Sequence, residues 1–466
     1  MNQKTISLIV AILIVGVGLA AYPVIKNNMI IKDPINHIMY SCMKTSKEKN
    51  LNANLSVKVE IDEKLAVEQG EFDNMSQNPD AMAAFINSLL KNFEILYDIN
   101  MITDDSNDLF KMNAGIDINY SEKTLIDGDF NLEPWELGIK LPKLYKKSLY
   151  IDINEVINAD GNDINLYDID FKAYLDLLQK EDELYEAVAK NYQPYKDIIY
   201  NYLQGKVEKL DKEMITLNVY GEDREIEVTK YRLNINLLDI YDVYGDLLEV
   251  VKNDEAVKAL LQSRIKEFKD LVIKNRDYEK FGLTEKEFTK DIKAIEDRIT
   301  NNWDEEIDTM ITEFKSISNK DEFSNLEDMI DNYTIAIDKN HLLRQVELDI
   351  QSQFIKIKEV ISCNAFGKNV KVNSLKLKDD EDKINLLNIK DDEVLTKEIG
   401  QEVVINLLSQ ILGGEAVEAL LADIKAESKV LPANESKEII NNVDDMFNQM
   451  KMYLPLMLKG MGLEND

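Results

Sequence analysis

The sequence has few of the residues that carry most covalent and metal chemistry. Its 466 residues include only two cysteines and two histidines. It contains no paired-histidine metalloprotease motif, no phosphate-binding or dinucleotide-binding glycine loop and no glycine-flanked nucleophilic serine. These absences exclude the familiar sequence signatures of metal-dependent proteolysis, nucleotide binding and serine hydrolysis. We therefore expect no catalytic motif, no cofactor and no bound metal.

Basic residues are also scarce relative to acidic ones. The chain holds 55 Lys and Arg against 87 Asp and Glu, a formal net charge of −32. Such a chain repels the phosphate backbone at long range, so no nucleic-acid partner is expected. With 45% apolar residues, 17 Gly and 8 Pro, the composition is still that of a folded chain of two or three domains.

The longest apolar run lies near the N-terminus. Twenty residues, Ile6–Ile25, carry no charge. As a helix rising about 1.5 Å per residue they would cross the roughly 30 Å hydrocarbon core. We expect an uncleaved single-pass anchor in the cell membrane. A signal peptide cleaved near Ala20 or Ala21 is the alternative, although the run is longer than a usual signal-peptide core.

The charges flanking the span are nearly balanced and do not decide its orientation. The body of the protein is expected on the extracytoplasmic side, because the tail before the span is short and long domains cross the membrane largely regardless of charge. The remaining sequence predicts an α+β fold: a long curved antiparallel sheet covered by helices, with an inserted helical hairpin. The predicted divisions are an N-terminal tail and anchor (1–27), a first helix and strand set (28–243), the helical hairpin (244–317), a second strand set (318–394) and C-terminal helices (395–466).

Strands are predicted where apolar and polar residues alternate. Leu55–Ile61 and Phe110–Tyr120 show this period of two most clearly. Alternation indicates a strand with one face on a core and the other in water. Further strands are expected at 135–141, at 149–153, in a hairpin over 213–236 turning at Gly221, and in a second set over 333–372.

Helices are predicted from apolar steps of three and four residues. Asp33-Pro34 marks a helix start, with Asp as the cap and Pro in the first turn. Val257–Val272 and Phe288–Phe314 carry apolar stripes, and Thr284 with Glu287 forms a capping box before the second stripe. The stripes are expected to pack on each other or on the sheet, with a partner helix as the alternative.

Methionines are concentrated in the last predicted helix. Because methionine is an adaptable filler, the helix is expected to pack against the sheet or to enclose an apolar ligand. Any such ligand is expected between the C-terminal helices and the sheet. The predicted ligand contacts are Met446, Met450, Leu454 and Met457.

The strand and helix order resembles that of uncharacterised membrane-anchored extracytoplasmic proteins of Gram-positive bacteria, whose sheet is similar to that of the bacterial lipoprotein-carrier family. The resemblance rests on Asp33-Pro34 and its helix leading into Leu55–Asp62, on the strand Lys147–Asn154, and on Val228–Asn236 leading into a helix. It covers about half of the chain and includes no specific motif. It implies a half-barrel whose concave face, plugged by helices, holds acyl chains; the inserted hairpin departs from that pattern.

The remaining candidate residues carry weaker signals. Acidic clusters at Asp104–Asp108 and Asp379–Asp382 offer oxygen ligands for Ca²⁺, but solvated turns are the simpler interpretation. His37 and His341 lie in no recognisable motif. Cys42 and Cys363 are expected to form either one disulfide or two buried thiols.

Together these patterns predict a membrane-anchored extracytoplasmic binding or scaffold protein that is not an enzyme and that holds an apolar ligand on the concave sheet face. Its expected partners are the membrane, through the N-terminal helix, and a lipid or protein. The alternative is a cell-surface hydrolase that uses a pair of carboxylates about 5–10 Å apart.

Overall fold

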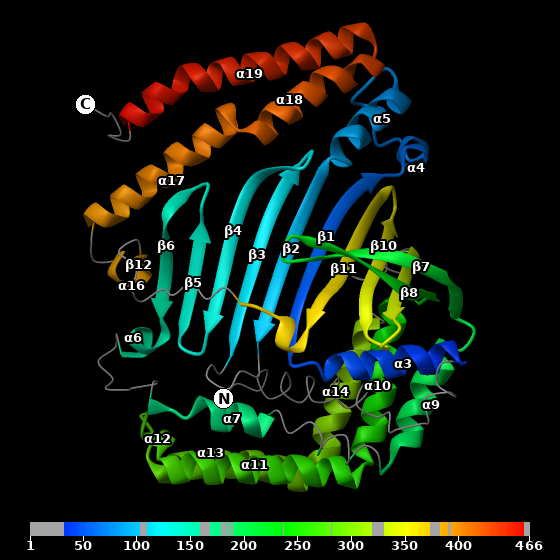
Figure 1. Cartoon of the computed structure of the whole chain (residues 1–466), viewed down its shortest axis with the longest axis vertical. Helices are drawn as coiled ribbons and strands as arrows, with labels where there is room; N and C mark the ends of the chain where they lie inside the picture. The colour runs from blue at the N-terminus through cyan, green and yellow to red at the C-terminus, as the bar shows by residue number, and fades with distance from the viewer. Residues whose placement is uncertain are drawn as a thin grey trace. The chain divides into compact units, whose positions relative to one another are not determined.

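The structure is an α+β fold with one long, mostly antiparallel sheet (Figure 1). The computed structural model describes residues 32–102, 110–158, 168–178, 190–235, 237–280, 282–318, 330–372, 383–389 and 393–460, together with Glu183 and Ala187. The predicted anchor at 6–25 lies outside these residues. The strand order is β12-β6-β5-β4-β3-β2-β1-β11-β10-β9-β8-β7.

The strands are β1 (Asn50–Ile61), β2 (Phe93–Ile102), β3 (Lys111–Tyr120), β4 (Lys123–Glu133), β5 (Glu136–Leu141), β6 (Tyr145–Asp152), β7 (Val207–Val219), β8 (Glu222–Asn234), β9 (Ile330–Asp338), β10 (Leu343–Ser352), β11 (Ile355–Phe366) and β12 (Lys383–Asn385). The pairing of β12 with β6 is parallel. The antiparallel pairs β1–β2, β2–β3, β3–β4, β4–β5 and β5–β6 join consecutive strands and so form a meander.

The helices are α3 (Pro34–Ser46), α4 (Glu63–Glu68), α5 (Pro79–Leu90), α6 (Ile153–Asn158), α7 (Phe171–Leu178), α9 (Tyr192–Leu203), α10 (Leu237–Lys252), α11 (Glu255–Asn275), α12 (Asp277–Lys280), α13 (Glu285–Asn301), α14 (Trp303–Ser318), α16 (Leu386–Ile389), α17 (Glu393–Gly413), α18 (Glu415–Glu427) and α19 (Ala433–Gly460). Short 3₁₀ turns lie at Gly367–Asn369 and Ser428–Val430.

The chain forms two compact units. The first contains the residues up to Lys49 and Ile157–Glu347, and the second contains Asn50–Val156 and the residues from Leu348 onward. The first unit therefore holds α3, the β7–β8 hairpin, β9 and the helices from α7 to α14. The second holds the β1–β6 meander, β11, β12 and the C-terminal helices.

The first unit begins with the predicted helix α3. Asp33 is its N-cap and accepts a hydrogen bond from the backbone of Asn36, and Pro34 occupies the first turn. The hairpin β7–β8 turns at Tyr220 and Gly221, which both have positive φ, as a tight two-residue turn requires. The predicted cap and the predicted hairpin are both confirmed.

The helical part of the first unit is more divided than the sequence pattern predicts. The stripe Phe288–Phe314 predicts one helix, but α13 ends at Asn301 and α14 begins at Trp303. Three acidic residues in the first turn of α14 favour a new helix start there, because they complement its N-terminal dipole. The region predicted as one hairpin thus contains two antiparallel helix pairs, α10 with α14 and α11 with α13.

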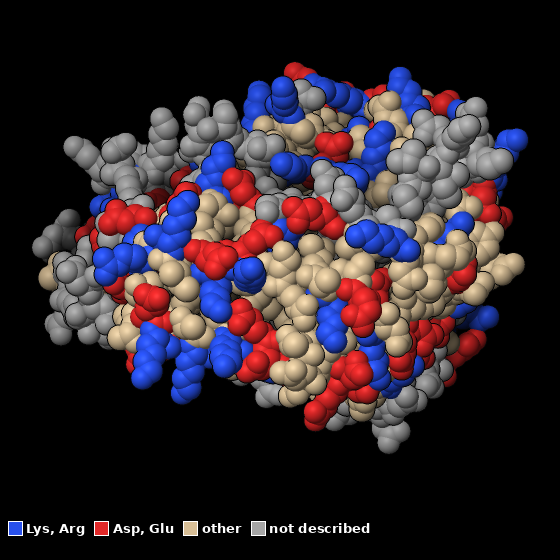
Figure 2. All heavy atoms as spheres, turned by 90° about the horizontal axis from the view of Figure 1, so that it is seen from below, with Lys and Arg blue, Asp and Glu red and all other residues tan. Residues whose placement is uncertain are grey.

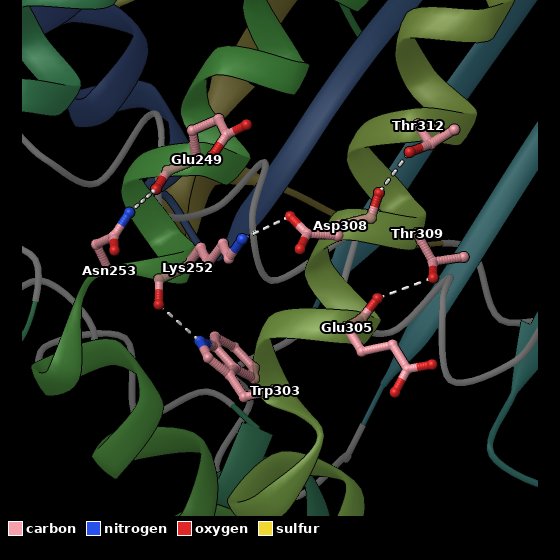
Figure 3. Close-up of polar contacts among 8 residues, drawn as sticks. All are labelled: Glu249, Lys252, Asn253, Trp303, Glu305, Asp308, Thr309 and Thr312. Atoms are coloured by element: carbon pink, nitrogen blue, oxygen red, sulfur yellow. Dashed lines mark hydrogen bonds and ion pairs between the residues drawn. The ribbon is translucent and has the colours of Figure 1, made fainter.

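The α10–α14 pair is held by Trp303 and by a buried apolar cluster. The indole Nε1 of Trp303 donates to the backbone oxygen of Lys252 at 3.0 Å, and the Lys252 ammonium pairs with Asp308 at 2.6 Å (Figure 3). Trp303 and Ile307 are buried in one cluster with residues of α9 and α10. Burial of such side chains stabilises the folded state by roughly 2 kcal/mol each.

The α11–α13 pair starts and packs as predicted. Thr284 and Glu287 form the capping box of α13, in which the Thr284 hydroxyl accepts from the Glu287 backbone and the Glu287 carboxylate accepts from the Thr284 backbone. Lys269 of α11 pairs with Glu296 of α13 at 3.2 Å. Figure 2 shows acidic and basic side chains interspersed over the face viewed from below, rather than segregated by sign.

In the second unit, the connection between β1 and β2 forms its own small core. Asn78 caps α5 and Pro79 lies in its first turn. Met82, Ala83 and Phe85 of α5 are buried with Ile61 of β1 and Leu431. The helices α17, α18 and α19 then run beside the ends of the strands (Figure 1). Helix α17 ends before Gly414, the N-cap of α18, and α19 begins at Ala433, directly after Pro432.

Candidate functional site

The second unit presents a broad apolar sheet face. Directly paired residues in antiparallel strands lie on one face, and the register places the apolar positions of β1 to β6 together. The central residues of this apolar face are Leu55, Val57, Ile95, Tyr97, Ile99, Ala114, Ile116, Ile118, Ile126, Phe130, Leu132, Leu137, Ile139 and Leu149. No polar side chain except Tyr97 interrupts it.

This apolar face is only partly covered by the described residues. Phe130 is 40% exposed and Ile126 is 36% exposed. No residue of β2 to β5 belongs to a hydrophobic core cluster among the described residues. Clusters of exposed large apolar side chains typically mark a binding surface. The apolar face is therefore the strongest candidate for ligand binding.

Helix α18 contacts the sheet at one end of the apolar face. Tyr120, at the end of β3, is fully buried and donates its hydroxyl hydrogen bond to Asp423 of α18 at 2.8 Å. Its ring meets Phe93 edge to face with centroids 4.7 Å apart. Burial, and also the Asp423 carboxylate, raise the pKa of Tyr120 to about 12, so its hydroxyl stays a donor. The middle of the face is half-buried, apart from the exposed Ile126 and Phe130.

The opposite face of the same strands is polar. Four asparagines, one on each of β1 to β4, face one another across the strands and form the asparagine row. They are Asn52, Asn100, Asn113 and Asn131. The Asn52 amide donates to Asn100 at 2.7 Å, and Asn113 donates to Asn131 at 3.2 Å. Side-chain pairs of this kind stabilise neighbouring strands.

Beside the asparagine row lies a set of carboxylates, the acidic platform. It consists of Asp98 on β2, Asp117 on β3, and Asp127 and Asp129 on β4. Gly115 on β3 lies between Asp98 and Asp129. Burial raises the pKa of Asp117, and the neighbouring carboxylates of Asp127 and Asp129 add to this rise. Burial likewise raises the pKa of Asp129, although Lys140 opposes the shift.

The predicted methionine contacts all lie on α19. Met446 is 48% exposed and Met450 is half-buried. The side chains of Leu454 and Met457 lie outside the described residues. The contacts of α19 that the structure shows most clearly are with α17, α18 and the turn at Ser428–Val430. The placement of a ligand against α19 stays a prediction.

The structure shows no disulfide between Cys42 and Cys363, which was one of the two alternatives that the sequence leaves open. Cys42 belongs to α3 in the first unit and Cys363 to β11 in the second. The alternative of two separate thiols fits this placement. Burial raises the pKa of Cys42 to about 11, which keeps it protonated and unreactive near neutral pH.

The two histidines, which the sequence shows in no motif, meet in the first unit. His37 Nε2 lies 2.9 Å from His341 Nδ1, and His37 Nδ1 lies 2.5 Å from the Tyr231 hydroxyl. Burial of the ring, with contributions from His341 and Lys209, lowers the pKa of His37 to about 4. Burial also lowers the pKa of His341. Both rings are therefore neutral at pH 7. A tyrosine–histidine–histidine chain gives a hydrogen-bond partner to both nitrogens of His37 and to Nδ1 of His341.

Nothing in the sequence signals this contact, because 304 residues separate the two histidines. The acidic clusters at Asp104–Asp108 and Asp379–Asp382 lie outside the described residues. Within the described part of the chain, no group of three or more His, Cys, Asp or Glu side chains is placed to hold a metal ion.

The second unit also has a shallow pocket and a long apolar stretch of helix. A shallow pocket of about 360 Å³ is lined by Lys429, Leu431, Ala433, Ser436, Lys437 and Ile440. Among the described residues, Val394–Val430 is the one stretch with the length and composition to cross a membrane, and 6% of the apolar 18-residue window within it is buried. Gly414 divides this stretch into α17 and α18.

The comparisons with known proteins add no relative from which a function can be transferred. No family model, no curated protein and no solved structure matches this chain. The features that bear on function are therefore the apolar and polar faces of the sheet and the sequence itself.

Proposed function

We propose that this protein is a membrane-anchored extracytoplasmic binding protein that holds an acyl chain on the apolar face of its second unit. The observation that carries the proposal is the incomplete burial of that face around Ile126 and Phe130. Removing exposed apolar surface from water gains about 25 cal/mol per Å², so a bound acyl chain would be stabilised there.

The choice of an acyl chain follows from the composition of the apolar face. Its aliphatic side chains, with Tyr97 as the one polar side chain in its centre, offer few hydrogen-bonding groups to a polar ligand. Binding must therefore depend on shape and apolar area. The apolar run at 6–25, which is expected to anchor the chain in a membrane, would keep this face close to a source of lipid. The resemblance to the lipoprotein-carrier family points to the same ligand class.

The test compares bound lipid in variants of the full-length chain. The chain is purified in a polymer-stabilised membrane disc, and the lipid retained after transfer to amphipol is extracted and quantified by mass spectrometry. The double variant Ile126→Asp with Phe130→Asp should lose most of the lipid held by the wild-type chain. Charged side chains placed on that face would have to be desolvated by the ligand.

A matched control changes an equally exposed apolar residue elsewhere. Met214 of β7 is 54% exposed, and Met214→Asp should leave bound lipid unchanged. A second double variant, Met450→Asp with Leu454→Asp, tests the location predicted from the sequence. If only that variant loses lipid, the ligand lies on α19 rather than on the apolar face. If the wild-type chain retains no more lipid than its isolated anchor peptide, the carrier role is wrong and a tethered scaffold remains.

The alternative function, a cell-surface hydrolase, has one observation in its favour. Asp98 and Asp129 lie on strands two apart and flank Gly115, which suits a pair of carboxylates about 10 Å apart. Hydrolysis of chromogenic glycosides by the wild-type chain, lost in Asp129→Asn, would establish it. The described residues around Gly115 on this face include no aromatic ring for stacking a sugar.

A further inference from the structure

The hairpin β7–β8 of the first unit has one open edge. Strand β7 is the last in the strand order, and among the described residues its only strand partner is β8. The outer edge of β7 therefore presents backbone N–H and C=O groups that no neighbouring strand occupies. Such an edge can accept a strand from another chain.

The turn of the hairpin determines which backbone groups face this edge. Tyr220 and Gly221 form a two-residue turn with positive φ at both positions, so Val219 and Glu222 are the hydrogen-bonded pair that closes it. Hydrogen-bonded pairs recur at every second residue of β7. The N–H and C=O groups of the residues between them therefore point away from β8, and these residues are Met214, Thr216 and Asn218.

The two halves of β7 differ in how well this edge is protected. Every residue of 208–213 except Leu210 is charged, and the register shifts between Lys209 and Lys212. Charges and bulges are the usual protection of an edge strand against pairing. Residues 214–219 carry no charge and keep a regular register with β8. The second half of β7 is thus the part of the edge that is left open to a partner.

This open half is self-complementary in an antiparallel register centred on Thr216. That register places Thr216 opposite Thr216 of a second copy and Met214 opposite Asn218, so exposed side chains meet exposed ones. Ile215 then lies opposite Leu217, and both are buried apolar residues of one cluster. The outward-facing residues all find partners, because hydrogen-bonded pairs in antiparallel strands exchange both backbone bonds.

The same register brings opposite charges together at both ends of the paired segment. It places Lys212 of one copy opposite Tyr220 of the other, beside the exposed acids Glu222 and Asp223 that follow the turn. The side chain of Lys212 is 65% exposed, so it can reach them. A two-fold axis repeats this contact at the other end. This charge complementarity favours a second copy of the chain as the partner.

We propose that two copies of this chain pair through their β7 strands, antiparallel and centred on Thr216, so that the sheet continues from one copy into the other. The interface is isologous, because the two-fold axis passes between the two Thr216 residues. The membrane anchor expected at 6–25 would hold both copies in one plane and raise their effective concentration. The pairing strands belong to the first unit, so pairing does not depend on lipid binding by the second.

The test is oxidative cross-linking of the full-length chain in membranes. In Thr216→Cys the two introduced thiols lie opposite each other with Cα atoms about 5.5 Å apart, which suits a disulfide. The expected product is a covalent dimer whose disulfide joins two copies of the same peptide. The wild-type chain gives the background from Cys42 and Cys363.

Glu225→Cys is the matched control, because Glu225 is also exposed and pairs with Thr216 from β8. In the proposed dimer the two Glu225 Cα atoms are farther apart by two strand spacings, at about 15 Å, which no disulfide spans. Glu225→Cys should therefore give less covalent dimer than Thr216→Cys by a factor of about ten or more.

A second pair of variants, each added to Thr216→Cys, tests the backbone hydrogen bonds. Met214→Pro removes an N–H that points to the second copy and not to β8, so the hairpin is retained. The loss of this bond from both copies should lower the yield of dimer about tenfold. Met214→Ala shortens the side chain but keeps the N–H, and it should leave the yield unchanged. If Met214→Pro loses the circular dichroism signal of the sheet, the comparison of Thr216→Cys with Glu225→Cys decides the question.

Three results would overturn the proposal. One is a yield of dimer from Thr216→Cys no higher than that from Glu225→Cys. Another is an undiminished yield when Met214→Pro is added and the protein still folds. The third is an adduct of Thr216→Cys with the mass of one chain and a different protein, which would identify β7 as a docking strand for another partner.

Discussion

The two units treat their apolar residues in opposite ways. In the first unit, Trp303 and Ile307 are buried in a continuous cluster between helices. In the second, Phe130 and Ile126 are more than a third exposed on a strand whose pattern is just as regular. The apolar residues of this face therefore contribute less to the stability of the second unit than the buried apolar residues contribute to the stability of the first. We propose that the second unit keeps this surface available for binding.

The largest difference in stability is expected when one apolar side chain in each unit is truncated to alanine. Ile307→Ala should lower the free energy of unfolding by about 2–5 kcal/mol, because it leaves a cavity in a fully buried cluster. Phe130→Ala should lower it by less than about 1 kcal/mol, because its ring is already 40% exposed. Urea unfolding of the full-length variants measures both. Equal losses would mean that the apolar face is as well packed as the core of the first unit.

The histidine pair gives the first unit a specific sensitivity to acid. The pKa of His37 is about 4 when folded and about 6.5 when exposed, so the unfolded chain takes up the proton first as the pH falls. This contribution is absent above pH 6.5 and grows to about 3 kcal/mol of destabilisation near pH 4.

In His37→Gln the loss of stability between pH 6.5 and pH 4.5 should therefore be smaller than in the wild-type chain. The comparison between the two proteins cancels the contribution of the many carboxylates. The same slope in both would show that His37 titrates normally.

A cap in the first unit should have an intermediate effect. Thr284→Ala removes the side-chain acceptor for the Glu287 backbone and should cost about 1 kcal/mol. Thr309 is the matched control, because it is exposed and its hydroxyl only donates back to the Glu305 backbone oxygen within α14. Thr309→Ala should change stability by a few tenths of a kcal/mol at most. Thermal melts compare the stability of the two variants. If Thr284→Ala is no less stable than Thr309→Ala, the capping box does not stabilise the protein.

The smallest effect is expected on the acidic platform and has the opposite sign to that of His37. The pKa of Asp117 is raised by burial and by adjacent carboxylates, so the ionised side chain opposes folding above its usual titration range. Asp117→Asn should raise the melting temperature at pH 7. The gain should disappear as the pH falls and the wild-type carboxyl becomes protonated. A lower melting temperature at pH 7 would show that Asp117 has a stabilising partner.

The sequence predicts the local features of this fold well. The cap at Asp33, the capping box at Thr284 and the alternation in β3 all follow from neighbouring residues, and the structure confirms them. Alternation shows that a strand has an apolar face but not whether a helix covers it. That is why the prediction placed covering helices over a face on which Phe130 is exposed.

The features that the sequence does not predict depend on contacts between distant residues. The asparagine row exists only because the register aligns Asn52 with Asn100 and Asn113 with Asn131. The contact of His37 with His341 needs the fold of the whole first unit. Single asparagines in strands, one histidine in a helix and one in a turn carry no sign of these arrangements.

We propose above that the apolar face of the second unit binds acyl chains. The most direct measurement is photo-crosslinking of the full-length chain, in membranes, with a fatty acid that carries a diazirine near its methyl end, followed by peptide mapping. We expect the label on the apolar positions of β2 to β5. This label should be lost in the Ile126→Asp and Phe130→Asp double variant. Label confined to the peptide containing residues 6–25, or to α19, would contradict it.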